Sequence, residues 1–432
     1  MLFLLSKRSW TVLLQVLLSI IIAYTLASIF ASCMHSGKEW AFKGTNNGFF
    51  FGDLRGLTSA LECPGDAKDV YILDNCVSEW LPKFNYTLLS LNALKFIRFK
   101  YAYTEYLGAA LGLSSIVVTC TFFARTIGKY LLWITCSTLA LASFPLQLAI
   151  ERGNSDQLLY AGLALYAWNT TTAPDSVIRK TSLVVLSFSL VALKIFPVLT
   201  IFSHGLLLRS RQIFLLAVPP SLVALFIQMP ILGSITANTP KGWGSNSYGF
   251  LTYYAPLIKK IAPANVDIRI VVAILILFKL IIIAATFRHW LSRKTQLRSG
   301  LDNLLLQIPK HQASYNFFLV GALTFVSTYF VFINWDYRLI SLFFCVPLLI
   351  ILSSRNSKAS EIRLFAVTCL VGIFIISYEG YVGLLAPSKG LVVGASMLSD
   401  LLIQPLVVGS IMYLIIFLGF TKTAPRYFTP NL

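Results

Sequence analysis

Charged residues are scarce in this chain, and acidic ones are the scarcest. Asp, Glu, Lys and Arg make up 12% of the 432 residues, about half of the ~25% that is usual in a soluble domain. Only 17 residues are acidic against 35 that are Lys or Arg, which gives a formal net charge of +18. Hydrophobic residues reach 57%. This composition excludes an ordinary soluble globular domain.

Several sequence motifs with known chemistry are also missing. The chain has no HExxH, no CxxC and no glycine loop of a nucleotide-binding kind. The lack of such a loop argues against an ATP-driven pump, and we find no soluble nucleotide-sugar domain. The four histidines fall on both sides of the predicted topology, so we expect no metal site among them: His35, His204, His289 and His311. No cofactor follows from the sequence, which leaves dependence on a divalent metal open.

Long apolar runs recur from one end of the chain to the other. The run 10–33 exceeds the ~20 residues that span a bilayer. It is also longer than the ~7–15 residues of a signal-peptide core, so we expect an uncleaved first helix. A transmembrane barrel would show short alternating strands instead. The sequence therefore predicts an all-α polytopic integral membrane protein with a single transmembrane domain over 1–432.

Hydropathy and basic flanking residues define the individual helices. We expect about 12 transmembrane helices (10–13), counting the run 181–208 as two. The other predicted helices are 10–33, 104–124, 130–150, 156–169, 212–233, 268–288, 315–333, 338–353, 363–383 and 398–420.

The run 181–208 carries basic residues at both ends and the letters KIFP, residues 194–197, in its middle. A single span cannot return to its own side. Pro197 removes an N–H and clashes with the preceding turn. We therefore expect two short helices that meet at KIFP, where protein or a watery cavity covers the freed backbone.

The distribution of Lys and Arg predicts the orientation, because cytoplasmic loops are enriched in these residues. Both termini and the loop 289–314 are expected in the cytoplasm, and the first outer loop, 34–103, outside. This rule also accounts for the positive net charge, so we expect contact with the lipid bilayer and not with nucleic acid. We expect a multi-pass protein of a bacterial inner or plasma membrane.

The outer side collects the chemically interesting side chains. An ionisable group within a membrane is costly and is a functional candidate for that reason. The alternative is a set of solvated loop charges and structural ion pairs. Asn154 or Ser155 could cap the helix after residue 155, and Tyr337 suits an interfacial aromatic belt. The ionisable candidates are Asp53, Arg55, Glu62, Glu151, Arg152, Asp156, Lys194, Asp336 and Arg338.

Cysteines on the outer side suggest a disulfide bond. Cys63 and Cys76 flank a short polar loop in a compartment that we expect to be oxidising. Two free thiols are the alternative. Just before this loop lies FFF, residues 49–51, whose rings we expect to bury in the membrane interface and to hold the loop down.

Four motifs follow one another along the chain: "DLRGLTSALEC…DVYILDNC", "ERGNSDQLLYAGLALYAW", "LKIFPVL" and "NWDYRLISLFF". In this order they resemble glycosyltransferase family 87, which belongs to the GT-C superfamily of polytopic glycosyltransferases. The resemblance extends from the first helix to about residue 350. The segment after Cys76 departs from the family's proline-rich pattern and keeps Trp80, Pro82, Asn85 and Tyr86 of it.

The resemblance implies a GT-C-like fold and a specific activity. Such enzymes take a sugar, here a hexose such as mannose, from a polyprenyl-phosphate-sugar donor and place it on a glycolipid or glycan acceptor outside the membrane. By resemblance Asp53 is the general base and Lys194 faces the carrier phosphate.

The residues themselves suggest the remaining roles. Arg152 and Arg338 could add cations for the departing phosphate, and Arg55 either orients Asp53 or reaches that phosphate. With one base and no evident nucleophile opposite it, we expect single displacement with inversion. The supporting polar residues are Glu151, Asn154, Asp156, Asp336 and Tyr337.

Two other functions fit part of the same pattern. A transporter or flippase of lipid-linked sugars would also have many helices, a broken helix and membrane-embedded charge. It is expected to show a repeat of its two halves, and the sequence has none that we detect. A catalytically inert membrane scaffold would tolerate substitution of Asp53 and Lys194.

Overall fold

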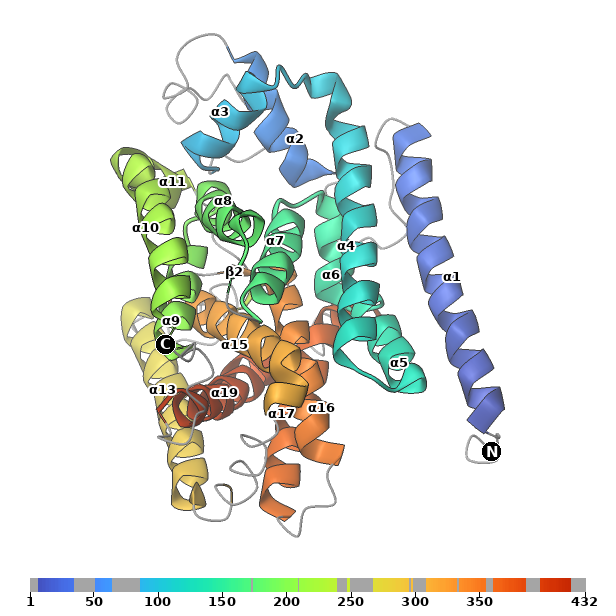
Figure 1. Cartoon of the computed structure of the whole chain (residues 1–432), viewed down its shortest axis with the longest axis vertical. Coiled ribbons are helices and arrows are strands. Elements are labelled where there is room, and N and C mark those ends of the chain that lie inside the picture. The colour runs from blue at the N-terminus through green and yellow to red at the C-terminus, as the bar shows by residue number, and fades with distance from the viewer. Residues whose placement is uncertain are drawn as a thin grey trace. The chain divides into compact units, whose positions relative to one another are not determined.

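The fold is seen in a computed structural model, in which helices dominate (Figure 1). The described residues are 7–34, 51–63, 86–171, 174–208, 210–238, 247–248, 267–294, 297, 308–331, 334–354, 360–385 and 397–420. They form two compact units whose segments alternate along the chain. The first contains Met1–Tyr166, Val184–Val198 and Pro219–Pro240, and the second contains Ala167–Leu183, Leu199–Val218 and Lys241–Leu432. The single domain expected from the sequence stays a prediction.

In the first unit, long helices carry a cap of short ones. Helix α1 packs against α4 and α5, and α2 packs against both α4 and α6 (Figure 1). Helix α3 lies against the short helix η2. The elements wholly in this unit are α1 (Lys7–Met34), α2 (Gly52–Ser59), η2 (Ala60–Glu62), α3 (Leu88–Phe96), η5 (Tyr101–Tyr103), α4 (Thr104–Thr126), α5 (Tyr130–Leu141), α6 (Phe144–Arg152), η6 (Met229–Ile231) and α11 (Leu232–Asn238).

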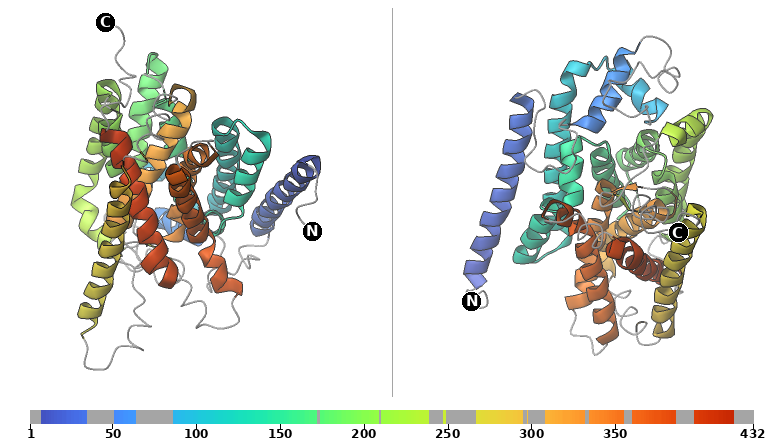
Figure 2. Two further views of the ribbon diagram at one scale, coloured as in Figure 1. Left: turned by 90° about the horizontal axis from the view of Figure 1, so that it is seen from below. Right: turned by 180° about the vertical axis from the view of Figure 1, so that it is seen from behind.

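The second unit is a bundle built mostly from the C-terminal half of the chain. Its elements are α13 (Ile268–Ser292), α15 (Ile308–Val331), η8 (Asp336–Cys345), α16 (Val346–Ser354), α17 (Ser360–Leu385), η9 (Ser399–Ile403) and α19 (Gln404–Phe420), with two short paired strands, β1 (Ser247–Tyr248) and β2 (Asn334–Trp335). The strands are antiparallel, with Ser247 opposite Trp335. Helix α13 packs along α19, as the two views of Figure 2 show.

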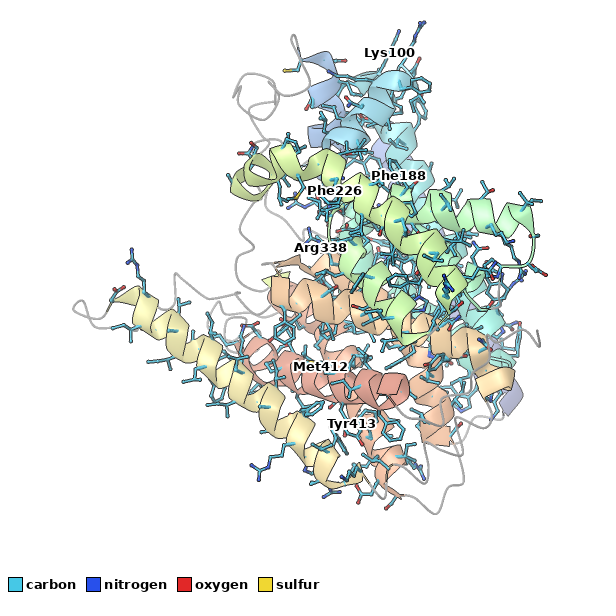
Figure 3. The ribbon with its side chains drawn as sticks, turned by 60° about the vertical axis from the view of Figure 1, so that its left-hand side comes forward. Lys100, Phe188, Phe226, Arg338, Met412 and Tyr413 are labelled. Atoms are coloured by element: carbon cyan, nitrogen blue, oxygen red, sulfur yellow. The ribbon has the colours of Figure 1, made fainter. Side chains whose placement is uncertain are left out.

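Aromatic rings on three helices help to hold this bundle together. The ring of Tyr413 on α19, labelled in Figure 3, lies 5.9 Å from that of Phe287 on α13 and 6.2 Å from that of Phe365 on α17. Edge-on and tilted rings at such distances attract one another in addition to the apolar area they bury. The bundle core is therefore well packed where α13, α17 and α19 meet.

Four helices contribute residues to both units: α7 (Asp156–Asn169), α8 (Val177–Leu193), α9 (Pro197–Leu207) and α10 (Arg211–Gln228). Helix α8 ends at Leu193 and α9 begins at Pro197. The helix break expected at KIFP is therefore confirmed. The predicted helix 156–169 is also confirmed, with the same bounds.

The helices identify the class of protein. Among the described residues, six helices are long and apolar enough to cross a membrane, or seven if one bent pair is a single span. Helix α13 exposes large apolar side chains such as Ile274, Leu277 and Ile281, each more than half exposed. Such a surface is suited to lipid and not to water. The chain is an all-α, multi-pass membrane protein, while the predicted number of about 12 helices and their orientation stay predictions.

The single helix predicted over 130–150 is wrong, because the structure has two helices here, α5 and α6, bent by 53°. Pro145 stands in the first turn of α6 and has no N–H to donate to the carbonyl of Leu141. The side-chain Nε2 of Gln147 donates to that carbonyl over 2.6 Å. The proline therefore ends one helix and starts the next.

Sequence analysis also missed short helices in the segment 34–103, which it predicted to be an outer loop. Helix α2 begins at Gly52 and has few apolar residues, so no hydropathy signal marks it. Helix α3 starts at a recognisable cap, because the Thr87 side chain accepts from the N–H of Ser90 over 3.2 Å. The predicted helix 338–353 begins as the 3₁₀ helix η8 and continues as α16. Gly321 on α15 lets η8 lie close to α15, since a Cβ on Gly321 would lie 2.5 Å from the Ser341 carbonyl.

Candidate functional site

A buried phenylalanine places the start of α2. Phe51 has a left-handed backbone with φ of 58°, its N–H donates to the carbonyl of Glu151 over 2.8 Å, and the residue is 0% exposed. A Cβ added to Gly108 or Gly153 would lie 2.6 or 2.9 Å from this side chain. Phe51 therefore occupies space that two glycines leave open. The expectation that its ring buries in the membrane interface is wrong, and Phe49 and Phe50 lie outside the described residues.

The carboxylate of Asp53 lies one residue beyond the N-terminus of α2. One oxygen accepts from the amide Nδ2 of Asn154 over 2.5 Å, and the other lies 3.5 Å from Nη1 of Arg152. The side chains of Arg152 and Asp53 are 19% and 22% exposed. The first turn of a helix also favours a negative charge. Three residues that sequence analysis had selected thus come together in the first unit.

The turn between α6 and α7 supplies both partners of this carboxylate. Gly153 ends α6 in the left-handed conformation, with φ of 59°, which a glycine adopts without steric cost. The carbonyl oxygen of the Asn154 side chain accepts from the N–H of Asp156 over 2.8 Å. Asn154 is therefore the residue that caps α7, and its amide nitrogen also binds Asp53. Glu151 and Asp156 are buried, at 6% and 3% exposure.

Lys194 lies in the break between α8 and α9 and faces an aromatic ring. Its Nζ is 4.7 Å from the centroid of the Tyr86 ring. The hydroxyl of Tyr86 donates to the main-chain carbonyl of Asp53 over 2.9 Å. Lys194 is thus linked to the α2 segment through one side chain. Sequence analysis gave Tyr86 no role, although its survival in the altered family pattern was a signal that could have marked it.

The side chain of Arg55 contacts the start of helix α4. Its guanidinium forms an ion pair with Glu105 at 2.9 Å and donates to the hydroxyl of Tyr101 over 3.1 Å. Residues two apart on a helix do not face one another, so Arg55 reaches Glu105 whereas Asp53 reaches Asn154. The ion pair fastens α2 to α4. Glu105 was missed because a single acidic residue at the start of a helix is an ordinary feature.

The remaining predicted residues are only partly described. Arg338, labelled in Figure 3, belongs to the second unit, where its carbonyl accepts from Ser341. The side chains of Asp336 and Tyr337 lie outside the described residues, so the roles of all three stay predictions. Cys63 is disulfide-bonded, while Cys76 lies outside the described residues and the pairing with it stays a prediction. In the part of the chain that the structure describes, no group of three or more His, Cys, Asp or Glu side chains is placed to hold a metal ion.

No family of known proteins, no curated protein and no solved structure matches this chain. The function is therefore inferred from the site itself. That site is a positioned, part-exposed carboxylate with an arginine beside it, to which a lysine is linked through Tyr86, in an all-α multi-pass membrane protein.

Proposed function

We propose that the protein is a glycosyltransferase that moves a sugar from a polyprenyl-phosphate carrier to an acceptor hydroxyl at the membrane surface. The observation that carries this proposal is the Asp53 carboxylate, which Asn154 and Arg152 hold while it remains about one-fifth exposed. A general base has to be both fixed in direction and reachable by the proton it removes.

The cations around the site support a phosphate leaving group. Transfer from a lipid phosphate breaks the bond between the sugar carbon and the phosphate oxygen, so negative charge develops on that oxygen. Arg152 and Lys194 belong to the same unit as Asp53. An arginine binds phosphate through parallel N–H donors, and a lysine acts as a compact positive charge. We assign Arg152 and Lys194 to the phosphate and Asp53 to the acceptor hydroxyl.

Single displacement with inversion is the expected course. Asp53 removes the proton from the acceptor oxygen as this oxygen attacks the sugar carbon, and the carrier phosphate leaves from the opposite face. A covalent sugar–enzyme intermediate would need a second positioned nucleophile. The acceptor is a glycolipid or glycan and the sugar a hexose such as mannose, as the resemblance to family 87 implies.

The test uses purified full-length protein in lipid nanodiscs, decaprenyl-phosphate-mannose and a panel of glycolipid acceptors. Mass spectrometry of the lipid products should show one added hexose with the wild type and none with Asp53→Asn. Glu62→Gln is the matched control, because Glu62 is an exposed carboxylate in the same segment. A wild type that adds sugar to no acceptor from any polyprenyl-phosphate donor would overturn the proposal. A flippase would instead move the labelled donor across a liposome membrane with its mass unchanged.

A further inference from the structure

Tyr86 contacts two parts of the candidate site with one side chain. Its hydroxyl bonds to the Asp53 carbonyl, and its ring faces the ammonium group of Lys194. Tyr86 is 7% exposed, so packing limits its choice of conformations. The attraction between a ring face and an ammonium ion strengthens as water is removed. The contact with Lys194 is therefore held in place.

The main chain beside Lys194 is held by other side chains of the same unit. The chain leaves the helical path after Leu193. The N–H of Lys194 still donates to the Leu190 carbonyl over 3.2 Å, but the carbonyls that follow Leu190 need partners outside the helix. The hydroxyl of Thr87 donates to the Ala192 carbonyl, and Nε2 of Gln228 donates to the Val191 carbonyl over 2.9 Å. In apolar surroundings an unsatisfied carbonyl would be costly. These bonds keep the break, and with it Lys194, in one place.

Resting on the proposed function, we propose that Tyr86 is a positioning residue that directs Lys194 toward the phosphate of a polyprenyl-phosphate carrier. The ring covers one side of the ammonium group, so a phosphate approaches this group from the remaining sides. The hydroxyl bond couples this arrangement to the α2 segment that carries Asp53. Tyr86 would thus set the phosphate-binding and base-carrying parts of the site relative to each other within the first unit.

Two substitutions separate the ring from the hydroxyl. Tyr86→Phe keeps the ring over Lys194 and loses the bond to Asp53, so kcat should fall while KM for the donor stays the same. Tyr86→Leu loses both contacts, so KM should rise as kcat falls. Loss of a desolvated cation–π contact corresponds to roughly 3- to 30-fold weaker carrier binding. A merely structural role would not separate kcat from KM in this way.

A binding measurement tests the inference without requiring transfer. Full-length protein in nanodiscs is titrated with decaprenyl phosphate, and decaprenol serves as the uncharged ligand. The variants are Tyr86→Phe, Tyr86→Leu, Lys194→Ala and the double variant Tyr86→Leu/Lys194→Ala. We expect the double variant to bind no more weakly than Lys194→Ala alone, because the ring then has no ammonium group to position. Tyr101→Leu is the matched control, since the Tyr101 ring faces Arg55, at 5.9 Å, in a second cation–π pair.

Additive losses in the double variant, or wild-type affinity in Tyr86→Leu, would overturn the positioning role. Equal affinity of the wild type for decaprenyl phosphate and decaprenol would overturn it as well. Should Tyr86→Leu fail to fold, the test uses Tyr86→Phe. The affinity of this variant for decaprenyl phosphate must match that of the wild type, and a weaker affinity would contradict the inference. Non-additive binding in a protein that transfers no sugar would support the role of Tyr86 and separately refute the transferase proposal.

Discussion

The two units each contain an acidic residue beside a basic one, and the two pairs differ in almost every respect. In the first unit, Asp53 lies 3.5 Å from Arg152, and both side chains are about one-fifth exposed. In the second unit, Nζ of Lys279 lies 2.9 and 2.8 Å from the two oxygens of Asp400, and both side chains are 1% exposed. The pair in the first unit has a long contact and is partly exposed to solvent, whereas the pair in the second unit has short contacts and is buried among apolar helices.

The two pairs differ in whether a substrate can reach them. Two charges buried in a low-dielectric interior persist only with close pairing, because each alone would carry a large desolvation cost. The charges of such a pair neutralise each other and are not accessible to a substrate. A part-exposed carboxylate held by a neutral amide can still accept a proton. The comparison supports the role in chemistry that we propose for Asp53 and indicates a role in helix packing for Asp400.

The largest expected effect comes from exchanging each aspartate for asparagine. Asp53→Asn should lower the rate of sugar transfer by about 10²–10⁴-fold, the usual contribution of a general base, with little change in stability. Asp400→Asn should instead lower stability, because Lys279 is left with a neutral partner. The measurements are transfer of radiolabelled mannose and the thermal unfolding midpoint in one detergent. Wild-type transfer by Asp53→Asn would mean that another group is the base.

The buried Lys279–Asp400 pair can also be broken by replacing its lysine. Lys279→Ala leaves the Asp400 carboxylate without its positive partner, and loss of one member of a buried pair typically costs about 3–5 kcal/mol. The double variant Lys279→Met/Asp400→Leu removes both charges and should recover most of this loss. Unfolding in mixed micelles with increasing dodecyl sulfate measures both. A double variant as unstable as Lys279→Ala would show that the two residues stabilise the bundle by more than neutralising each other's charge.

Gly108 tests how firmly the site is built on Phe51. Gly108→Ala adds a Cβ that would lie 2.6 Å from the Phe51 ring, and such overpacking typically costs about 1–3 kcal/mol. Because Phe51 positions α2, transfer should decline as well. Gly128→Ala is the control, since nothing lies within 4 Å of a Cβ there. Equal behaviour of the two variants would contradict the role given to Phe51.

The smallest effect is expected at the ion pair between Arg55 and Glu105. Their side chains are 17% and 27% exposed, and pairs with access to water contribute about 0.2–1 kcal/mol. A double-mutant cycle of Arg55→Ala and Glu105→Ala should return a coupling energy in this range, falling as salt is added. Loss of donor binding on Arg55→Ala would restore the phosphate role that sequence analysis had allowed for it.

Short-range features of the fold were readable along the chain. Apolar runs predicted the helices at 10–33, 104–124 and 156–169, which the structure has as α1, α4 and α7. The proline at 197 predicted the break between α8 and α9. Pro145 offered the same signal and was not used. The short polar helix α2 was missed because its burial depends on other segments.

The amino-acid sequence by itself determined that this chain is an α-helical membrane protein, that a helix breaks before Pro197, and which polar side chains are candidates for chemistry. These properties depend on hydrophobic length and on residues within a turn of one another. Only the tertiary structure decided the partners. Asp53 meets Asn154, Arg55 meets Glu105, and Lys279 meets Asp400. Each pair is widely separated in sequence, so its contact depends on how helices pack, which no local pattern specifies.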